Sequence, residues 1–255
     1  MSREINRLTN AWFEFKGLRS DSLDILISNL PQREIPARNM KRTKVAARDG
    51  SIRQSDDSYD DINVRVSFKL LNQAKRNDVA KMLTGSGKLR FWDEPDYEYD
   101  AVIEDVPRRT YEERHFDVQD YDVNFVCHPF KTLYTPADDI VKTSSGGNFT
   151  NPGTAPSLPR VKIAGSGTFS LSIGLQTMFF KNVTGGGIIV DSELGDALTY
   201  DGALLANEKI GDSELFKLQP GMNAVTWIDG SHTYEGQTVN GTVTSVTITP
   251  RWRYV

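Results

Sequence analysis

The sequence predicts a mainly β protein with two domains, and two features of the chain support this fold class. Short segments of alternating apolar and polar residues recur along most of its 255 residues, separated by Gly, Asn, Asp and Pro, which is typical of antiparallel strands and turns. The charge density also changes, because residues 1–144 hold 23 Lys and Arg with 25 Asp and Glu, whereas residues 145–255 hold 7 and 9. We therefore expect a charge-rich β domain over residues 1–145 and a charge-poor one over residues 146–255.

The first domain contains a strand that leads into a helix. Residues 62–70, INVRVSFKL, alternate without a break, which predicts an antiparallel strand with one buried face. Asn72 then provides an N-cap, and apolar residues recur at the spacing of one helix face. We expect one helix over residues 73–84, ended by Gly85.

Two more β segments complete this domain. Residues 88–106, KLRFWDEPDYEYDAVIEDV, predict two strands joined by an acidic turn at residues 93–96. Residues 115–127, HFDVQDYDVNFVC, alternate in one phase and then in the other. This one-residue slip predicts a β-bulge near Gln119–Asp120.

The second domain is predicted to be a β-sandwich. Short strand patterns recur every 8 to 15 residues with no helical pattern between them, which is typical of sandwiches and jelly rolls. Pro156 and Pro159 fit an edge strand that begins the sandwich, because an edge strand tolerates a missing N–H. Gly165-Ser166-Gly167 then indicates a turn into the next strand.

The composition argues against several classes of function. The net charge of −4 gives no electrostatic basis for sequence-specific nucleic-acid binding or for attraction to an anionic membrane. The single cysteine, Cys127, excludes a disulfide framework within the chain and a Cys-rich zinc site, and it fits synthesis in a reducing cytoplasm. The N-terminus lacks an apolar h-region and no apolar run is long enough for a bilayer, so we expect no signal peptide and no membrane insertion.

The sequence also contains no catalytic pattern. The histidines at positions 115, 128 and 232 lie far apart and have no metal-binding spacing. The segment TGSGK at residues 84–88 ends the predicted helix, whereas a phosphate loop opens one. No G-x-S-x-G elbow is present, and the acidic clusters fit solvated turns better than a glycosidase pair. We therefore expect no catalytic residue, no cofactor and no metal site.

The strongest charge pattern lies between residues 33 and 61. Residues 33–53 hold seven Lys and Arg against two acids, and residues 55–61, SDDSYDD, hold four Asp. A solvated hairpin would explain this pattern. Alternatively, the two blocks are complementary surfaces by which one subunit binds the next, as in head-to-tail rings. The candidate residues of this inter-subunit arm are Arg38, Lys41, Arg42, Lys44, Arg48, Asp56, Asp57, Asp60 and Asp61.

Two tryptophans provide a second candidate site. A β-sandwich can bind a saccharide by stacking it on an exposed aromatic ring, and Trp227 and Trp252 are the candidates. Each alternates with apolar residues in a predicted strand, which favours burial. The alternative function is thus a carbohydrate-binding module whose partner is a host cell-wall saccharide, and the exposure of the two rings decides between these interpretations.

Several segments together resemble a known family. In the first half these are the basic stretch that ends in RDG, the helix, the hairpin LRFWDEPDYEYDAVI and the strand YDVNFVCHPF. In the second half they are NPGTAPSLPRVKIAGSG, IIVDSELGDALTYDGALL, DSELFKLQPGMNAVTWIDG and the closing ITPRWRYV. In this order, they resemble the distal tail protein (Dit) family, or siphophage tail component family, of phages with long non-contractile tails. Ala46-Ala47-Arg48 departs from the Pro-Gly-Arg that the family often has there, which bears on local turn geometry.

The resemblance implies a fold and a role that composition does not show. It implies an N-terminal β domain with one helix and a hairpin arm, which assembles six copies into a ring, followed by a C-terminal galectin-like β-sandwich outside the ring. It places the protein at the virion tail tip, between the major tail tube protein and a tail-associated lysin or tail fibre hub protein. DNA would pass through the central channel of this homo-oligomer, and the protein would be structural rather than an enzyme.

Overall fold

The computed structural model describes residues 10–105, 108–112, 115–211, 214–234 and 236–255. The chain divides into two compact units, Met1–Tyr134 with Val255, and Thr135–Tyr254. This division falls before the boundary expected from charge density at residue 145. The reason is that β13 (Ile140–Lys142) pairs with β22 (Thr242–Thr249) of the second unit.

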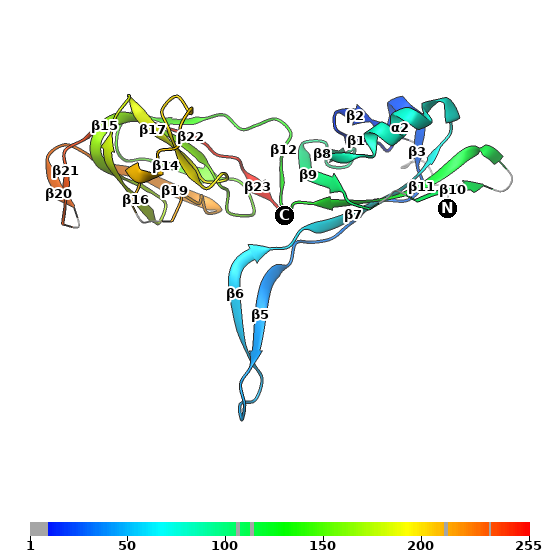
Figure 1. Cartoon of the computed structure of the whole chain (residues 1–255), viewed down its shortest axis with the longest axis horizontal. Coiled ribbons are helices and arrows are strands. Elements are labelled where there is room, and N and C mark those ends of the chain that lie inside the picture. Colours follow the sequence, from blue (N-terminus) through cyan, green and yellow to red (C-terminus); the bar gives the residue numbers. More distant parts are fainter. Residues whose placement is uncertain (1–9, 106–107, 113–114, 212–213, 235) are drawn as a thin grey trace. The chain divides into compact units, whose positions relative to one another are not determined.

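The first unit is a curled antiparallel sheet with a single α-helix among its described residues (Figure 1). The main path of the sheet runs in the order β2-β1-β8-β9-β11-β7-β3, with β10 on β11, β4 on β7 and β12 on β9. Its strands are β1 (Phe13–Phe15), β2 (Leu18–Arg19), β3 (Ile25–Ile27), β4 (Gln32–Arg33), β7 (Ile62–Leu70), β8 (Gly85–Phe91), β9 (Tyr97–Ile103), β10 (Arg108–Glu112), β11 (His115–Cys127) and β12 (Lys131–Leu133).

An aromatic cluster closes this curl. Phe13 and Phe15 of β1 lie with ring centroids 6.1 and 5.1 Å from that of Phe125 of β11, although two strands separate β1 from β11 in the sheet. Phe13 also lies 5.6 Å from Phe68 of β7, whose ring stacks on Tyr121. The two ends of the sheet therefore share one core, because each contributes inward-facing rings to it.

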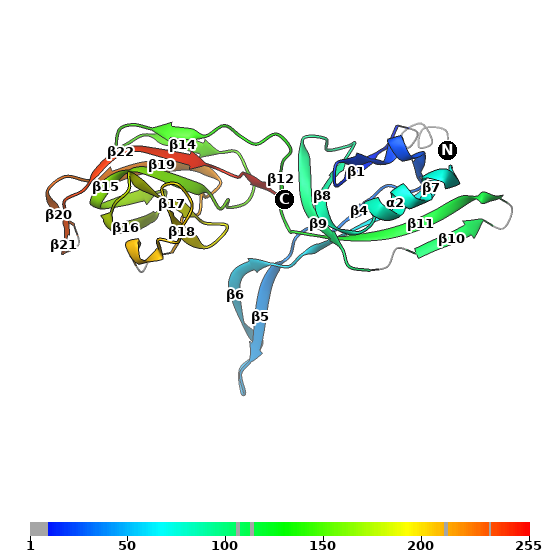
Figure 2. The same ribbon diagram turned by 45° about the horizontal axis from the view of Figure 1, so that its top comes forward.

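The expected helix is confirmed but shorter than its pattern. A 3₁₀ turn, η2 (Gln73–Lys75), leads into α2 (Arg76–Met82), and the Asn72 side chain caps this start by accepting from the Ala74 N–H at 3.0 Å. Figure 2 shows α2 among β1, β7 and β11. Gly85 is not the stop, since the helix ends at Met82 and Gly85, at φ +73°, begins β8. Because α2 has only seven residues, no described helix could span a membrane.

The expected bulge in β11 lies slightly earlier than the alternation placed it. From Gln119 to Cys127, β11 pairs with β7 without a break. The irregularity is against β10, where Tyr111 pairs with Gln119 but the next residue, Glu112, pairs with His115. Extra residues between His115 and Gln119 therefore shift the phase of the strand.

The second unit is the expected β-sandwich, built around one long strand. Its strands other than β13 and β22 are β14 (Asn148–Asn151), β15 (Arg160–Ile173), β16 (Gln176–Val183), β17 (Gly187–Asp191), β18 (Asp196–Thr199), β19 (Gly221–Ile228), β20 (His232–Tyr234), β21 (Gln237–Val239) and β23 (Arg253–Tyr254). The first half of β15 pairs with β17 and β22, and its second half pairs with β16 and β19. A single strand thus belongs to both layers.

This arrangement corrects two expectations about the start of the sandwich. Pro159 does not begin an edge strand, because β15 starts at Arg160 with β22 on one side and β17 on the other. Gly165-Ser166-Gly167 is not a turn either, since all three residues lie within β15 where it passes between the layers. Gly167 has φ +82°, and a Cβ there would lie 2.7 Å from the Cα of Gly241. The glycines permit a bend and a close backbone approach.

Within the second unit, an ion pair joins the C-terminal segment to the end of β17. Arg251 donates two hydrogen bonds to Asp191 at 2.6 and 2.9 Å, and the Asp191 side chain is only 3% exposed. Burial raises the pKa of Asp191, but the bonds from Arg251 and from the backbone N–H groups of Leu194 and Glu193 outweigh it. The net pKa therefore lies below the usual value.

We predict that Phe125→Ala destabilises the first unit by about 3–5 kcal/mol, because it removes a fully buried ring from the centre of the aromatic cluster. Urea denaturation followed by circular dichroism measures this change. Ile35→Ala is the control, because that side chain is 81% exposed, and its effect should stay within about 0.5 kcal/mol. Equal stability of the two variants would contradict the closed curl.

We also predict that stability falls as pH drops through about 4, where the Asp191 carboxylate of the unfolded chain becomes protonated first. The stabilisation by the Asp191 carboxylate is fully present above that pH, because the pKa of Asp191 is lower in the folded than in the unfolded chain. Asp191→Asn should cost about 3 kcal/mol at pH 7 and flatten this pH dependence. Thermal unfolding from pH 7 to pH 3 is the measurement. Glu193→Gln is the matched control, because Glu193 also contacts Arg251 but is 52% exposed.

Candidate assembly surface

The residues expected to form an arm do form a hairpin. Among the described strands, β5 (Arg38–Lys44) and β6 (Ser51–Tyr59) pair only with each other, and Figure 1 shows them as a separate ribbon. Every side chain from residue 41 to residue 50 is exposed. An isolated two-stranded ribbon is only marginally stable in water. Contact with another protein surface would therefore stabilise the β5–β6 ribbon.

The basic residues gather in the outer half of the ribbon. Arg42 lies directly opposite Arg53, and Lys44 lies opposite Ser51, next to the turn that carries Arg48. Like charges in opposite positions repel each other. None of the five cations from Lys41 to Arg53 forms an ion pair with any residue of the described ranges. Arg53, which was not among the candidates, thus belongs to the same basic tip.

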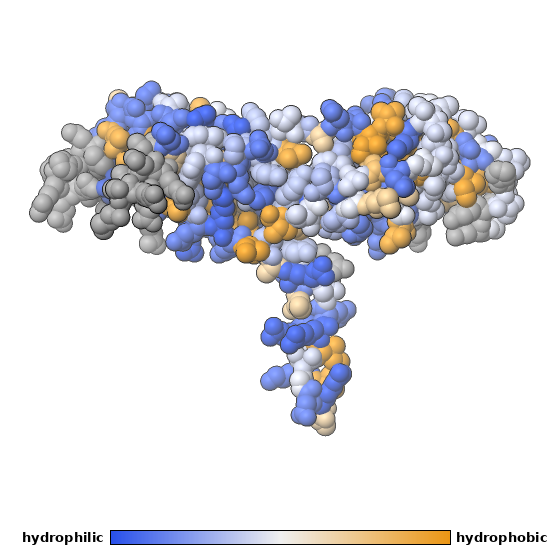
Figure 3. Space-filling view, turned by 180° about the vertical axis from the view of Figure 1, so that it is seen from behind, coloured by the Kyte–Doolittle hydropathy of each residue, from blue (hydrophilic) through white to orange (hydrophobic). Residues whose placement is uncertain are grey.

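The two faces of the ribbon carry different cross-strand pairs. One face carries Arg42 with Arg53, because cross-strand partners point to the same side of a sheet. The other face carries the cross-strand pair Thr43 and Ile52, and Ile52 is 43% exposed. The space-filling view in Figure 3 shows hydrophilic and hydrophobic residues along the ribbon. Both faces are mixed, because Lys41 lies on the same face as Thr43 and Ile52, and Met40 lies on the same face as Arg42.

The base of the ribbon is held by side chains. The Arg38 guanidinium lies over the ring of Tyr59, and Asn39 donates to Ser58 at 2.9 Å. Tyr59 in turn meets Phe130 at a centroid distance of 4.9 Å. These contacts fix where the hairpin leaves the first unit.

The acidic candidates lie at this base rather than opposite the basic tip. Asp60 and Asp61 are exposed and stand between β6 and β7. The backbone of Asp56 and Asp57 lies in β6, while their side chains are outside the described part of the structure. Along the hairpin, the cations from Lys41 to Arg53 therefore lie outward together with Asp49, while Asp60 and Asp61 lie at the base with Arg38.

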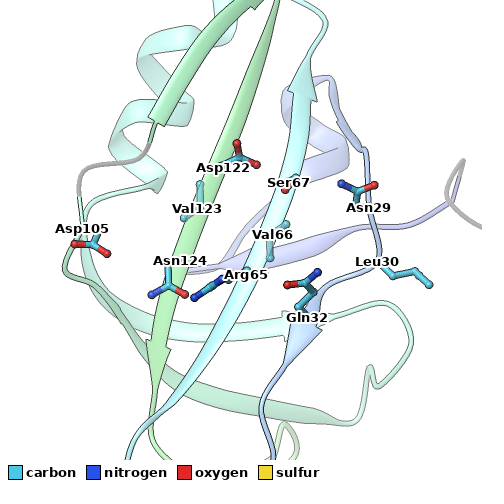
Figure 4. Close-up of a pocket in the computed structure, with 10 residues that line it drawn as sticks. All are labelled: Asn29, Leu30, Gln32, Arg65, Val66, Ser67, Asp105, Asp122, Val123 and Asn124. Carbon is cyan, nitrogen blue, oxygen red and sulfur yellow. The ribbon is translucent and has the colours of Figure 1, made fainter.

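A polar groove of about 570 Å³ opens on the first unit (Figure 4). It combines side chains of β7 and β11 with those of the segments around β4 and after β9. Its lining residues are Asn29, Leu30, Gln32, Arg65, Val66, Ser67, Asp105, Asp122, Val123 and Asn124. No ion pair to Asp105, Asp122 or Arg65 occurs within the described ranges.

A chain of hydrogen bonds fixes the orientation of the Asn124 amide in the groove. The Glu34 carboxylate accepts from the backbone N–H and the Nδ2 of Asn63, at 2.9 and 3.0 Å. These two bonds also lower the pKa of Glu34. Asn63 Oδ1 then accepts from Asn124 Nδ2 at 2.8 Å. Because a carboxylate only accepts, this order leaves Asn124 Oδ1 as an acceptor, and it is buried with no donor among the described residues.

No local sequence pattern predicted this groove. Alternation in residues 62–70 predicted that Arg65 and Ser67 face outward, which the structure confirms. The hollow itself depends on loops that are distant in sequence, so no local pattern marks it. The sole sequence signal was the excess of charged residues in this half of the chain.

The proposed saccharide contacts are not at the surface. Trp227, in β19, is 8% exposed and Trp252 is 7% exposed. Trp252 lies near Phe149, at a centroid distance of 6.4 Å. Burial of both rings removes the sequence argument for stacking a sugar on either of them.

Comparison with known proteins gives a match at the level of structure. No family model and no curated protein sequence matches the chain. Among solved structures it is similar to the SPP1 Dit (gp 19.1) protein, described as a paradigm of the hub adsorption apparatus in phages that infect Gram-positive bacteria. The TM-score is 0.68 at 13% identity, over 94% of this chain and 98% of that chain. The resemblance found in the sequence is therefore confirmed in the structure, and this chain has the fold of a phage distal tail protein.

Proposed function

We propose that this chain is a structural protein of a phage tail tip, in which six copies form a ring. The observation that carries the proposal is the structural likeness to the SPP1 Dit protein over nearly the full length of both chains. A match of this extent includes both units and the order in which they occur. The role is one of assembly and contains no catalytic step.

Each unit has its own part in this proposal. The first unit forms the ring and surrounds a channel for DNA, and its arm, from Arg38 to Asp61, contacts the neighbouring copy. The second unit is a galectin-like sandwich on the outside. The ring joins the major tail tube protein to a tail-associated lysin or tail fibre hub protein. The exposed ribbon supports this view, because it has a large unburied surface and a basic tip whose cations form no ion pair with the described residues.

We predict that the purified protein forms particles of six times 28.6 kDa, about 172 kDa. Mass photometry and negative-stain microscopy measure the mass and the shape, first with the protein alone and then with the tail tube protein present. Closed rings under either condition support the proposal. A monomer under both conditions would contradict it.

A shortened arm provides the matched variant. Replacing residues 40–57 with Gly-Asn-Gly retains the contacts at Asn39, Ser58 and Tyr59 that hold the base. Since the removed segment belongs to neither core, the variant should keep the circular dichroism spectrum of a folded β protein. We expect it to lose assembly. Rings of normal mass would show that the arm is not needed.

A further inference from the structure

The chain carries two surfaces of opposite charge whose charged side chains form no ion pairs with the described residues. The outer half of the ribbon holds Lys41, Arg42, Lys44, Arg48 and Arg53 against the single acid Asp49. The polar groove on β7 and β11 has two exposed carboxylates, Asp105 and Asp122, with Glu104 exposed beside them. None of these acids has an ion pair with a residue in the described ranges.

We infer that the basic tip of the arm of one copy docks in the polar groove on β7 and β11 of a second copy. This inference rests on the proposed function and names the surface that receives the arm. The contact is head-to-tail, because the tip and the groove are different surfaces of the same chain. Contacts of this type give closed rings when the rotation between copies allows it.

Charge complementarity is the first reason for choosing this occupant. The tip has an excess of four positive charges between residues 41 and 53, and the described lining of the groove holds two acids against one cation, Arg65. In the backbone register of β10 and β11, Arg108 lies opposite one of these acids, Asp122. Guanidinium groups bind carboxylates through paired N–H donors, which adds geometric selectivity to the attraction. Docking would also relieve the repulsion between Arg42 and Arg53, since each would acquire an acidic partner.

The buried acceptor in the groove is the second, independent reason. Asn124 Oδ1 has no donor among the described residues, and the hydrogen bonds from Asn124 through Asn63 to Glu34 prevent the Asn124 amide from turning around. A buried acceptor without a partner costs free energy. The five N–H donors of an arginine could satisfy such a site while also binding Asp122.

The main competing receptor is the acidic base of the arm itself. Asp60 and Asp61 are exposed and negative, so the tip of one arm could lie against the base of another. A hollow of about 270 Å³ next to the base is lined by Pro36 and Ile62, but neither Asp60 nor Asp61 is among its lining residues. Among the described residues, the base also has no orphaned acceptor, unlike the groove. The groove therefore offers both charge and shape, and the base serves as the control site.

Charge reversal tests the pairing. The tip variant is Arg42→Glu with Arg53→Glu, the groove variant is Asp105→Lys with Asp122→Lys, and the base control is Asp60→Lys with Asp61→Lys. Sedimentation velocity at about 0.05 and 0.5 M salt measures self-association, which should weaken with salt because rim charges are screened. We expect the tip and groove variants each to weaken association about tenfold or more.

Rescue distinguishes the receptors. Combining the tip and groove reversals should restore association to within a few fold of the original protein, whereas combining the tip and base reversals should not. Restoration by the base, or unchanged association in either the tip or the groove variant, would overturn the inference while leaving ring formation intact. A chain that is monomeric in all salts would also overturn it, and the experiment with the tail tube protein would then decide the proposed function separately.

Cysteine pairing gives a second readout if a reversed variant loses its fold. Arg42→Cys and Asp122→Cys are prepared as separate proteins, mixed and oxidised, and Cys127 does not compete because it is fully buried. We expect a cross-linked dimer on a non-reducing gel from this mixture, and none when Asp60→Cys replaces Asp122→Cys. If Arg42→Cys cross-links to Asp60→Cys but not to Asp122→Cys, the tip binds the base of a second arm and the inference is wrong.

Discussion

The β5–β6 ribbon buries almost none of its side chains, and a ribbon of this kind is barely stable in water by itself. Within the described part of the chain its strands pair only with each other, so the sheet from which the ribbon extends adds no backbone hydrogen bonds to it there. A second surface must cover it if it is to be ordered along its length. The placement of charge, with the cations of the tip outward and Asp60 and Asp61 at the base, supports the proposal that this second surface is polar and acidic.

Side-chain contacts in the rest of the first unit restrain the point at which this ribbon leaves the sheet. The rings of Phe13, Phe15 and Phe125 hold the two ends of the curled sheet together. At β4, where the chain leaves for the arm, Arg33 binds Asp93 at 2.6 Å and Glu94 at 3.2 Å, and its guanidinium lies over Phe91. A partly buried guanidinium with two carboxylates and a ring restrains the direction of the chain better than a single exposed pair does.

Sequence patterns predicted most of the fold, because alternation and capping are local. The strand at 62–70, the Asn72 cap and the hairpin arm are all present. The patterns failed where distant segments decide the outcome. Pro159 and Gly165 were assigned to an edge strand and a turn, whereas pairing with β17 and β22 makes one continuous central strand. The arm candidates could be chosen from charge, but the groove depends on Asn124 and on loops brought together only by folding.

A cryo-electron microscopy reconstruction of the assembled protein would test the central claim most directly. It should show a closed ring in which the tip of each arm lies on the β7–β11 face of the adjacent copy, with the arm ordered from its base to its turn. Arms that extend into solvent without touching a neighbour, or particles that contain one copy even with the tail tube protein present, would contradict it.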